Sequence, residues 1–313
     1  MAHPTAVILV AGLSPSLIGK ASPRIAKMSR QGRLRRLKPV LPAVTCSVQS
    51  TMLTGLAPSQ HGIVGNGWYD RPSAEICFWK QSNHLVAGEK VWETARRRDP
   101  SVTCLKMFWW YNMYSSADYS VTPRPIYKAD GRKIPDCYSH PPHLRDQLQE
   151  RFGPFPLFSF WGPGCSIRSS QWIADATIHL HEQLHPTLTL VYLPHLDYGL
   201  QKLGPEHRRI SKQVSEIDRV VGGLLDYFDA QDVRSLILSE YGIEPVDEAV
   251  HINRFLREEG AVAVRSEEGM ELLDAGASDA FAVADHQVAH LYVKDPNKVR
   301  HYADLCGKIP GVA

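Results

Sequence analysis

The chain has 313 residues, of which 43% are hydrophobic and 22% are charged, and its formal net charge is +2. This length and apolar content suit a single large α/β domain that buries a sizeable core. The small net charge argues against a nucleic-acid-binding surface, and no segment approaches the roughly 20 apolar residues of a membrane span.

The six cysteines are scattered along the chain and form no CxxC pair, which argues against a disulfide framework or a zinc–thiolate site. Free thiols are typical of a reducing compartment. The apolar run at residues 6–11 follows no basic segment, so it predicts a buried first strand instead of a signal peptide. We therefore expect a cytoplasmic protein without a membrane partner.

In the first part of the chain, the pattern of apolar residues predicts a strand at 6–11, helices at 23–33, 46–53 and 89–98, and a strand at 101–109. The first strand is apolar throughout, as in a parallel sheet that is covered on both faces. The helix at 46–53 ends at Gly55, and Thr45 lies at or near its N-cap. A hydroxyl is therefore expected at the start of a helix, where backbone N–H groups have no intrahelical partner.

Residues 110–170 are rich in Trp, Tyr, Phe, Pro and Gly, and their periodicity is weak. We interpret this region as an inserted aromatic-rich cap, or as long loops that lie over the site. The alternative is that the aromatic side chains form a satellite core. Trp110, at the start of the region, is a candidate for lining a substrate pocket with its ring.

After residue 170 the sequence predicts helices at 171–184, 206–228 and 252–260, and strands at 187–197, 233–242 and within 281–293. This order predicts a doubly wound, mostly parallel sheet flanked by helices, in a single domain over residues 1–313. Ligands bind such sheets at the carboxyl ends of the strands. The polar residues expected at that edge are Thr45, Asp197, Glu240 and His286.

The most informative segment is PAVTCSVQSTMLTGLAPSQHGIVGNGWYD, residues 42–70. Its pattern is Pro-x-x-Thr, then T-G-x-x-P-x-x-H-G-I, then Asn, and it resembles the nucleotide pyrophosphatase/phosphodiesterase branch of the alkaline phosphatase superfamily. Thr45 falls on the nucleophile of that family and Asn66 on its phosphate-binding asparagine. Further matches follow in chain order at 88–95, 106–110, 192–205, 238–243 and 282–287. The resemblance implies an alkaline-phosphatase-like fold.

The resemblance also implies a chemistry. In the family, one of two zinc ions lowers the pKa of the threonine hydroxyl, and both hold the phosphoryl oxygens. The helix N-terminus at Thr45 and the Asn66 side-chain amide would bind the same phosphate. The implied activity is hydrolysis of a phosphate mono- or diester, with a small phosphorylated metabolite or a nucleotide-like compound as the substrate.

The chain departs from the family at the positions of the metal ligands. The changed positions are Ala11 in place of the first aspartate, Gln201 in place of a histidine, and Glu240-Tyr241 in place of Asp-His. Alanine has no ligating atom, and Zn²⁺ prefers His, Cys and carboxylate ligands. The resemblance in sequence therefore does not carry a two-zinc site with it.

Some donors for a metal ion remain. Asp197 keeps its place in the motif, and the last histidine corresponds to His286, with His290 as the alternative. We expect Asp197, His286 and Glu240 to hold one divalent ion, Zn, Mn or Mg, or none.

Without a metal ion, Thr45 needs another base. The two candidates are His286, oriented by Asp285, and His195, which is close to Asp197 in the sequence. A histidine paired with a carboxylate can accept a proton from a hydroxyl. The sequence leaves the choice between them open.

Three functions are compatible with these residues. The first is hydrolysis of a phosphoric ester with Thr45 as the nucleophile. The second is a metal-independent group-transfer reaction of a biosynthetic pathway, in which Gln201, Tyr241 and His195 contact the substrate in place of metal ions. The third is a degenerate protein that binds a phosphorylated metabolite without turnover.

Overall fold

The computed structural model describes residues 2–38 and 40–313. They form two compact units, and each is described by itself. The first unit contains the described residues of Met1–Ile63 and Gln81–Pro245, and the second contains Val64–Lys80 and Val246–Ala313. The sequence predicts a single domain, whereas the structure groups the C-terminal segment with a short stretch that follows the α3 helix (Pro58–His61).

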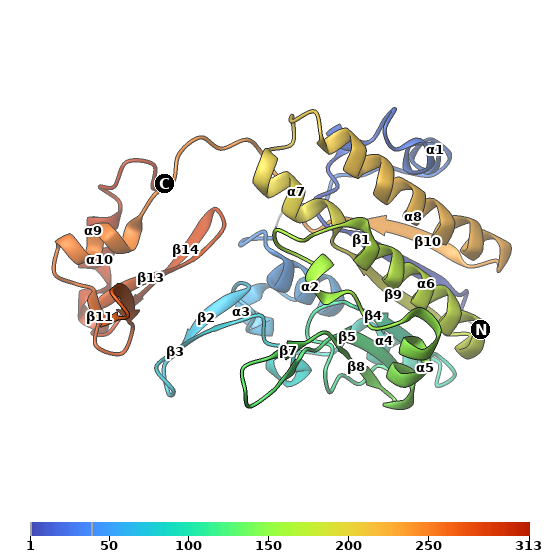
Figure 1. The fold of residues 1–313 in the computed structure, drawn as a ribbon, viewed down its shortest axis with the longest axis horizontal. Helices are drawn as coiled ribbons and strands as arrows, with labels where there is room; N and C mark the ends of the chain where they lie inside the picture. The colour runs from blue at the N-terminus through green and yellow to red at the C-terminus, as the bar shows by residue number, and fades with distance from the viewer. Residues whose placement is uncertain (1, 39) are drawn as a thin grey trace. The chain divides into compact units, whose positions relative to one another are not determined.

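The first unit is built on a six-stranded sheet with the strand order β10-β1-β9-β4-β5-β8 (Figure 1). Its strands are β1 (Thr5–Val10), β4 (Cys104–Met107), β5 (Tyr119–Pro123), β8 (Cys137–His140), β9 (Leu188–Leu193) and β10 (Arg234–Leu238). β8 runs antiparallel to β5, and the other neighbouring strands are parallel. The prediction of a mostly parallel α/β sheet is confirmed.

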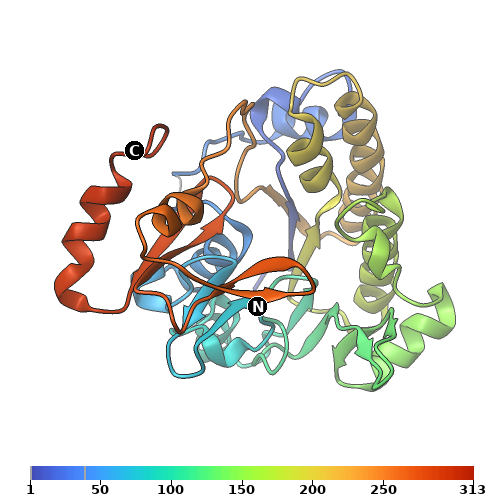
Figure 2. The same cartoon turned by 60° about the vertical axis from the view of Figure 1, so that its left-hand side comes forward.

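Helices cover this sheet. They are α1 (Pro23–Gln31), α2 (Thr45–Thr54), α3, α4 (Val91–Arg98), α5 (His143–Phe152), α6 (Ile167–Leu184), α7 (His195–Leu203) and α8 (Ile210–Ala230). α6 and α8 pack side by side, with α6 against β9 and α8 against β10 (Figures 1 and 2). α8 buries Val214, Ile217, Val221, Leu224 and Phe228, a spacing of three and four residues that forms one apolar stripe.

The strand predicted at 187–197 is shorter than expected. β9 ends at Leu193, and α7 begins at His195 after Pro194, whose carbonyl accepts a hydrogen bond from the Asp197 N–H at 3.0 Å. A proline cannot donate to a sheet, but it is tolerated where a helix starts. Asp197 therefore lies in the first turn of a helix and not at the tip of a strand.

The region predicted as a cap, 110–170, contributes β5 and β8 to the central sheet, so these two strands are not part of an insertion. Phe155 and Phe160 are buried against Phe108 and Trp172, with a Phe108–Phe155 centroid distance of 4.7 Å. These aromatic side chains belong to the core. A cap formed by the rest of the region, which includes β6 (Ile126–Tyr127), β7 (Lys133–Ile134) and η3 (Leu157–Ser159), stays a prediction.

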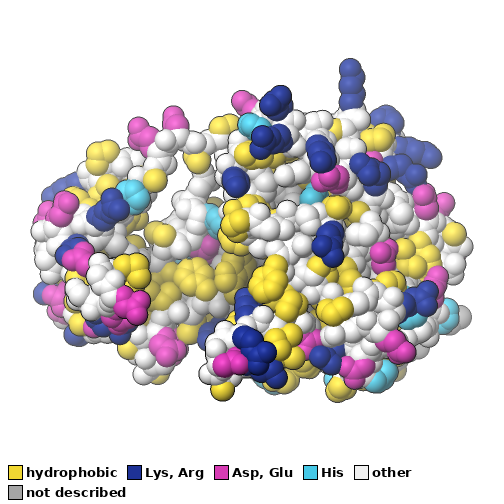
Figure 3. Space-filling view, in the orientation of Figure 1, with side chains coloured by type: hydrophobic (Ala, Val, Ile, Leu, Met, Phe, Trp, Pro, Cys, Tyr) yellow, Lys and Arg dark blue, Asp and Glu magenta, His cyan; other side chains and the backbone are white. Residues whose placement is uncertain are grey.

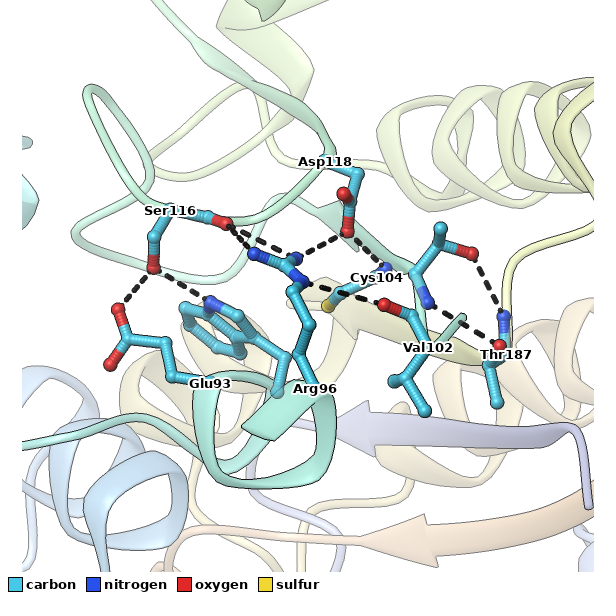
Figure 4. A network of polar contacts seen from close by, with 9 residues as sticks. Glu93, Arg96, Val102, Cys104, Ser116, Asp118 and Thr187 are labelled. Carbon is cyan, nitrogen blue, oxygen red and sulfur yellow. Dashed lines mark hydrogen bonds and ion pairs between the residues drawn. The ribbon is translucent and has the colours of Figure 1, made fainter. Parts of the chain in front are cut away.

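A polar network holds α4 to the sheet (Figure 4). The Arg96 guanidinium contacts the Asp118 carboxylate at 2.6 Å, and the same carboxylate oxygen accepts the Cys104 N–H at 2.8 Å. The indole N–H of Trp92 donates to the Ser116 hydroxyl at 2.9 Å. α4 is thereby tied both to β4 and to the segment that leads into β5.

The second unit consists of three hairpins and two helices. The hairpins are β2 (Gly67–Asp70) with β3 (Glu75–Phe78), β11 (Ala263–Glu267) with β12 (Met270–Asp274), and β13 (Ala280–Asp285) with β14 (Val288–Val293). The helices are α9 (Ile252–Glu258) and α10 (Val299–Cys306), and the 3₁₀ turn η4 (Pro296–Lys298) precedes α10. The first unit has further 3₁₀ turns at η1 (Pro15–Leu17) and η2 (Asn83–Leu85). Within the described residues, no helix is long and apolar enough to cross a membrane.

The strand expected within 281–293 is a pair of strands. Asp285 is in register with Val288, and His286 between them has a positive φ of 60°. A residue with left-handed backbone conformation lets the chain reverse direction in a tight turn. The continuous apolar pattern of this stretch gives no sign of such a turn. The two histidines of this stretch therefore lie in different positions, His286 in the turn and His290 on β14.

Candidate active site

Thr45 is the first residue of α2. The preceding Val44 is extended and provides no side-chain cap, and the Val48 N–H makes the first helical hydrogen bond, to the Val44 carbonyl at 3.1 Å. Gly55 ends the helix in the left-handed conformation, at φ 70°. The N–H groups of the first turn point out of the helix, and the helix dipole places partial positive charge there. Thr45, 4% exposed, thus lies where an anion is favoured.

The carboxylate of Asp197 is the centre of the polar contacts in this part of the first unit. It accepts hydrogen bonds from Tyr241 Oη at 2.8 Å, from Trp161 Nε1 at 2.7 Å, and from Gln201 Nε2 at 3.0 Å to each oxygen. Gln201 lies one helical turn after Asp197 on α7, so these two side chains share a face. Asp197 is 5% exposed, and neutral donors stabilise its negative charge.

Tyr241 connects Asp197 to Thr45. Its hydroxyl donates to Asp197, so its oxygen is left to accept the Thr45 hydroxyl proton across 3.3 Å. Burial, followed by the charges of Asp197 and Glu240, raises the pKa of Tyr241 well above its usual value. Thr45 is also close enough to the buried phenol of Tyr192 to lower its pKa, which burial raises well above the usual value. The result is a chain of hydroxyl groups that leads from the helix N-terminus to a carboxylate.

Glu240 is a buried carboxyl group beside this chain. It is 7% exposed, and burial, with a further contribution from the charge of Asp197, raises its pKa to about 8. Gln49 is close enough to lower that pKa, yet among the described residues neither Glu240 oxygen nor Gln49 Nε2 has a partner in hydrogen-bond geometry. Glu240 is therefore mostly protonated at neutral pH.

Trp110 lies next to the same helix. Its N–H donates to Gln49 Oε1 at 2.9 Å, and its carbonyl accepts from the buried Lys106 ammonium at 2.9 Å. Lys106 also donates to the Tyr111 carbonyl at 2.9 Å, and burial lowers its pKa to about 7. These bonds fix the backbone of Trp110 relative to α2. Substrate binding by its ring stays a prediction.

His195 begins α7, and its Nε2 contacts the Glu216 carboxylate of α8 at 3.1 Å. The residue is 3% exposed, and burial lowers the pKa of its imidazole, although Glu216 opposes that shift. The sequence suggested Asp197 as the carboxylate beside His195, but the structure pairs His195 with Glu216. Contact between His195 and the substrate stays a prediction.

Asn66, in the second unit, is held by Asp285. Its backbone N–H donates to Asp285 Oδ2 at 2.6 Å, and its side-chain Nδ2 donates to Oδ1 at 3.0 Å. Both residues are buried, at 1% and 4% exposure. A Cβ atom on Gly65 would lie 2.9 Å from the same carboxylate, so glycine is needed there for the close approach. The orientation of the Asn66 amide is therefore fixed from two sides.

His286 and His290 also belong to the second unit and differ in their contacts. His286 Nε2 lies 3.8 Å from Asp285 Oδ1, and its side chain is 41% exposed. His290 Nε2 is 2.7 Å from the Val64 carbonyl oxygen, to which it donates a hydrogen bond. Of the two, His286 has the more accessible imidazole.

The residues of the first unit do not fit a zinc ion. Among the described residues there is no group of three or more His, Cys, Asp or Glu that could hold a metal. Ala11 is fully buried without a ligating atom, and the oxygens of Asp197 face the N–H and O–H groups of Trp161, Gln201 and Tyr241. An indole N–H has no lone pair to offer a cation.

Trp161 and Tyr192 were not predicted as site residues. Trp161 lies in a loop with no regular spacing to Asp197, so nothing in the sequence indicates the contact. It also lines a cavity of about 380 Å³ with Leu157, Phe158 and Phe160. Tyr192 stands near the end of β9, five residues before Asp197, and that position at the carboxyl edge was a usable signal.

Residues 5–309 match the model of the type I phosphodiesterase / nucleotide pyrophosphatase family. The chain belongs to this family. The match covers nearly the whole sequence and confirms the resemblance seen in the segment 42–70. It also agrees with the central, mostly parallel sheet of the first unit.

Curated relatives are similar at low identity. An uncharacterized pyrophosphatase/phosphodiesterase of Schizosaccharomyces pombe is 24% identical over 251 residues, which are 77% of this chain and 43% of the relative. Ectonucleotide pyrophosphatase/phosphodiesterase family member 1 is 22% identical over 250 residues in Homo sapiens and 23% over 258 residues in Mus musculus, covering 76% and 79% of this chain. This chain spans 23% and 24% of those two proteins, so it covers less than half the length of each of the three relatives.

Proposed function

We propose that this family member cleaves phosphoric esters of the nucleotide pyrophosphatase/phosphodiesterase type, with Thr45 as the nucleophile. The observation that carries the proposal is the hydrogen-bonded chain from Thr45 through Tyr241 to Asp197. It supplies a hydroxyl, a path for its proton and a carboxylate that receives the proton. The N-terminus of α2 supplies the partial positive charge that a phosphoryl group needs.

The first step forms a bond between Thr45 Oγ1 and phosphorus and breaks the ester P–O bond. As Thr45 attacks, its proton moves to Tyr241, and the Tyr241 proton moves to Asp197. The phenol stays neutral at the end of this transfer, which agrees with its strongly raised pKa. The leaving alkoxide takes a proton from solvent. A water molecule then attacks phosphorus and breaks the P–Oγ1 bond, its proton goes to solvent, and Asp197 returns its proton through Tyr241 to Thr45.

Gln201 and Trp161 orient the base. Three of the four hydrogen bonds on Asp197 come from these two side chains, so the carboxylate has one defined position beneath Tyr241. The donors are neutral, and they stabilise the negative charge without a metal ion. The proposed reaction therefore uses the protein's own hydroxyl and carboxylate groups.

The second unit contributes Asn66 to the proposal. Its side-chain amide has two N–H groups, and the bond to Asp285 defines the plane in which the amide lies. We assign to Asn66 a hydrogen bond to a phosphate oxygen of the substrate, and to His286 a role in proton transfer. The exposed imidazole of His286 supports the second assignment.

Thr45→Ala tests the nucleophile, with bis(4-nitrophenyl) phosphate as the substrate. Turnover of the variant should fall to a small residual rate, whereas Thr45→Ser, which retains a hydroxyl, should keep much more of the activity. Both variants should bind the reaction product, 4-nitrophenyl phosphate, with similar affinity. Unchanged turnover in Thr45→Ala would refute the role of Thr45.

A second function is favoured by one observation, namely that Asp197 is held by neutral donors and Ala11 cannot ligate a metal. In this reaction Thr45 would pass its phosphoryl group to an alcohol acceptor instead of water. Turnover with and without an added alcohol distinguishes the two. A phosphorylated alcohol product favours transfer, and release of the phosphate to water alone favours hydrolysis. Tight binding of a phosphorylated metabolite with no turnover at all would indicate a binding protein.

A further inference from the structure

A second cavity of the first unit lies at the carboxyl end of β5. Its volume is about 550 Å³, and its lining includes Arg124, Tyr127, Asp136, Tyr138 and Arg145. β5 is parallel to β4, and β4 is parallel to β9, so this cavity opens at the same edge of the sheet as Asp197. That edge is where ligands of doubly wound sheets bind. The proposed reaction makes no use of this cavity.

The acidic group of the cavity is already neutralised. Asp136 accepts hydrogen bonds from Arg145 Nε and Nη2, both at 2.7 Å, and from the Cys137 N–H at 2.8 Å. This bidentate pair fixes the Arg145 guanidinium and balances its charge. Neither residue therefore contributes a free charge to a ligand.

Arg124 does contribute one. It follows the last residue of β5, and its backbone N–H donates to the Asp136 carbonyl at 3.0 Å, which fixes its position at the cavity. Its exposed guanidinium contacts the Met113 sulfur at 3.8 Å and, in the part of the chain that is described, has no carboxylate partner. A positive charge thus remains unbalanced in a concave surface, where an anion is attracted.

The walls of the cavity are aromatic and apolar. Tyr127 is 71% exposed and Ile126 is 38% exposed, although both belong to the short strand β6. Tyr138 is held edge-on by Tyr114, with a centroid distance of 6.1 Å. The Lys133 ammonium lies 5.8 Å from the Tyr127 ring centroid and adds positive charge. Figure 3 shows Lys and Arg side chains beside hydrophobic ones over the β6–β7 hairpin.

We propose that this cavity binds an aromatic anion, a planar ring that carries a carboxylate or a phosphate. Arg124 pairs with the anionic group, and Tyr127 packs on the face of the ring. The β6–β7 hairpin provides Tyr127 to this cavity and Lys133 to the cavity that contains Trp161. The same ligand chemistry fits the distal end of a long substrate or a separate small molecule.

Binding of 4-fluorobenzoate, measured by ¹⁹F NMR titration, tests the site, and the dependence of the affinity on Arg124 distinguishes this cavity from anion binding at the N-terminus of α2. Arg124→Gln should weaken binding at least about tenfold, as expected for the loss of one charge-assisted hydrogen-bonded pair. Tyr127→Ala should weaken it several-fold. The matched control is the variant Arg219→Gln. Arg219 is an exposed arginine of α8 without a carboxylate partner among the described residues, so this variant should bind 4-fluorobenzoate as the unmodified chain does.

Equal affinity in Arg124→Gln and the unmodified chain would overturn the proposal, provided that both unfold at the same temperature. Acetate and benzoate, which contain no fluorine, can be compared by their displacement of 4-fluorobenzoate. Equal displacement by the two would overturn the role of the ring. Turnover of bis(4-nitrophenyl) phosphate then identifies the source of the ligand. Inhibition by 4-fluorobenzoate that competes with substrate supports the distal end of a substrate, and Arg124-dependent binding without competition supports a separate molecule. If no turnover exists, the titration still decides the site independently of Thr45.

Discussion

Replacing Tyr241 by phenylalanine removes one oxygen atom and breaks the path between Thr45 and Asp197. The ring is retained, so packing changes little, but Thr45 loses its acceptor at 3.3 Å and Asp197 loses a donor at 2.8 Å. Asp197 keeps the bonds from Gln201 and Trp161. If Tyr241 relays the proton, kcat should fall by about 10²- to 10⁴-fold, the usual contribution of general-base assistance.

The structural cost should be smaller than the catalytic one. A hydrogen bond to a charged group contributes about 1.5–3 kcal/mol, so Tyr241→Phe should lower the melting temperature by several degrees without unfolding the protein. The assay is kcat and KM for bis(4-nitrophenyl) phosphate, together with the double variant Thr45→Ala/Tyr241→Phe. Because both residues act in one step, the double variant should be no slower than Thr45→Ala alone.

Two results would refute this reasoning. A Tyr241→Phe enzyme with kcat within twofold of the unmodified chain would show that the proton leaves Thr45 by another route. A double variant whose losses are fully additive would show that the two residues act in separate steps. In either case His286 becomes the next base to test, by His286→Gln in the same assay.

Three further predictions follow from the contacts. Trp161→Phe keeps the ring but removes the N–H on Asp197, and should lower kcat about tenfold with little change in KM; a change in KM alone would contradict it. Asp285→Ala leaves two donors of Asn66 without their acceptor and should cost about 1–3 kcal/mol in thermal unfolding, whereas an unchanged melting temperature would exclude that role. Glu240→Gln should become more stabilising as pH rises. The pKa of Glu240 is raised from 4.5 to about 8 in the folded protein, so between these pH values the folded protein holds a proton that the unfolded chain loses. The free energy of unfolding of the unmodified protein therefore declines as pH rises from 4.5 to about 8, by at most about 5 kcal/mol. Melting temperatures at pH 5 and pH 8 measure this, and a constant difference between the two proteins would contradict it.

Local pattern was enough for the elements that carry the fold. The apolar run of β1 predicts a buried strand because only a strand covered on both faces lacks polar positions. The spacing of three and four residues predicts α8, and the glycine at position 55 marks the end of α2. The motif around Thr45 placed the chain in its family. These features depend on residues that are close together in the sequence, so the sequence by itself determined them.

The partners of the site residues depended on the tertiary structure. Trp161 reaches Asp197 from a loop 36 residues earlier, and His195 turns to Glu216 on the next helix, because packing of α7 brings those side chains together. The hairpin of β13 and β14 depends on a left-handed residue at His286, which an apolar pattern does not reveal. β5 and β8 joined the sheet from an aromatic-rich region, since burial against long-range neighbours outweighed weak local periodicity. Which donors surround a carboxylate, as Trp161, Gln201 and Tyr241 surround Asp197, is set by the fold.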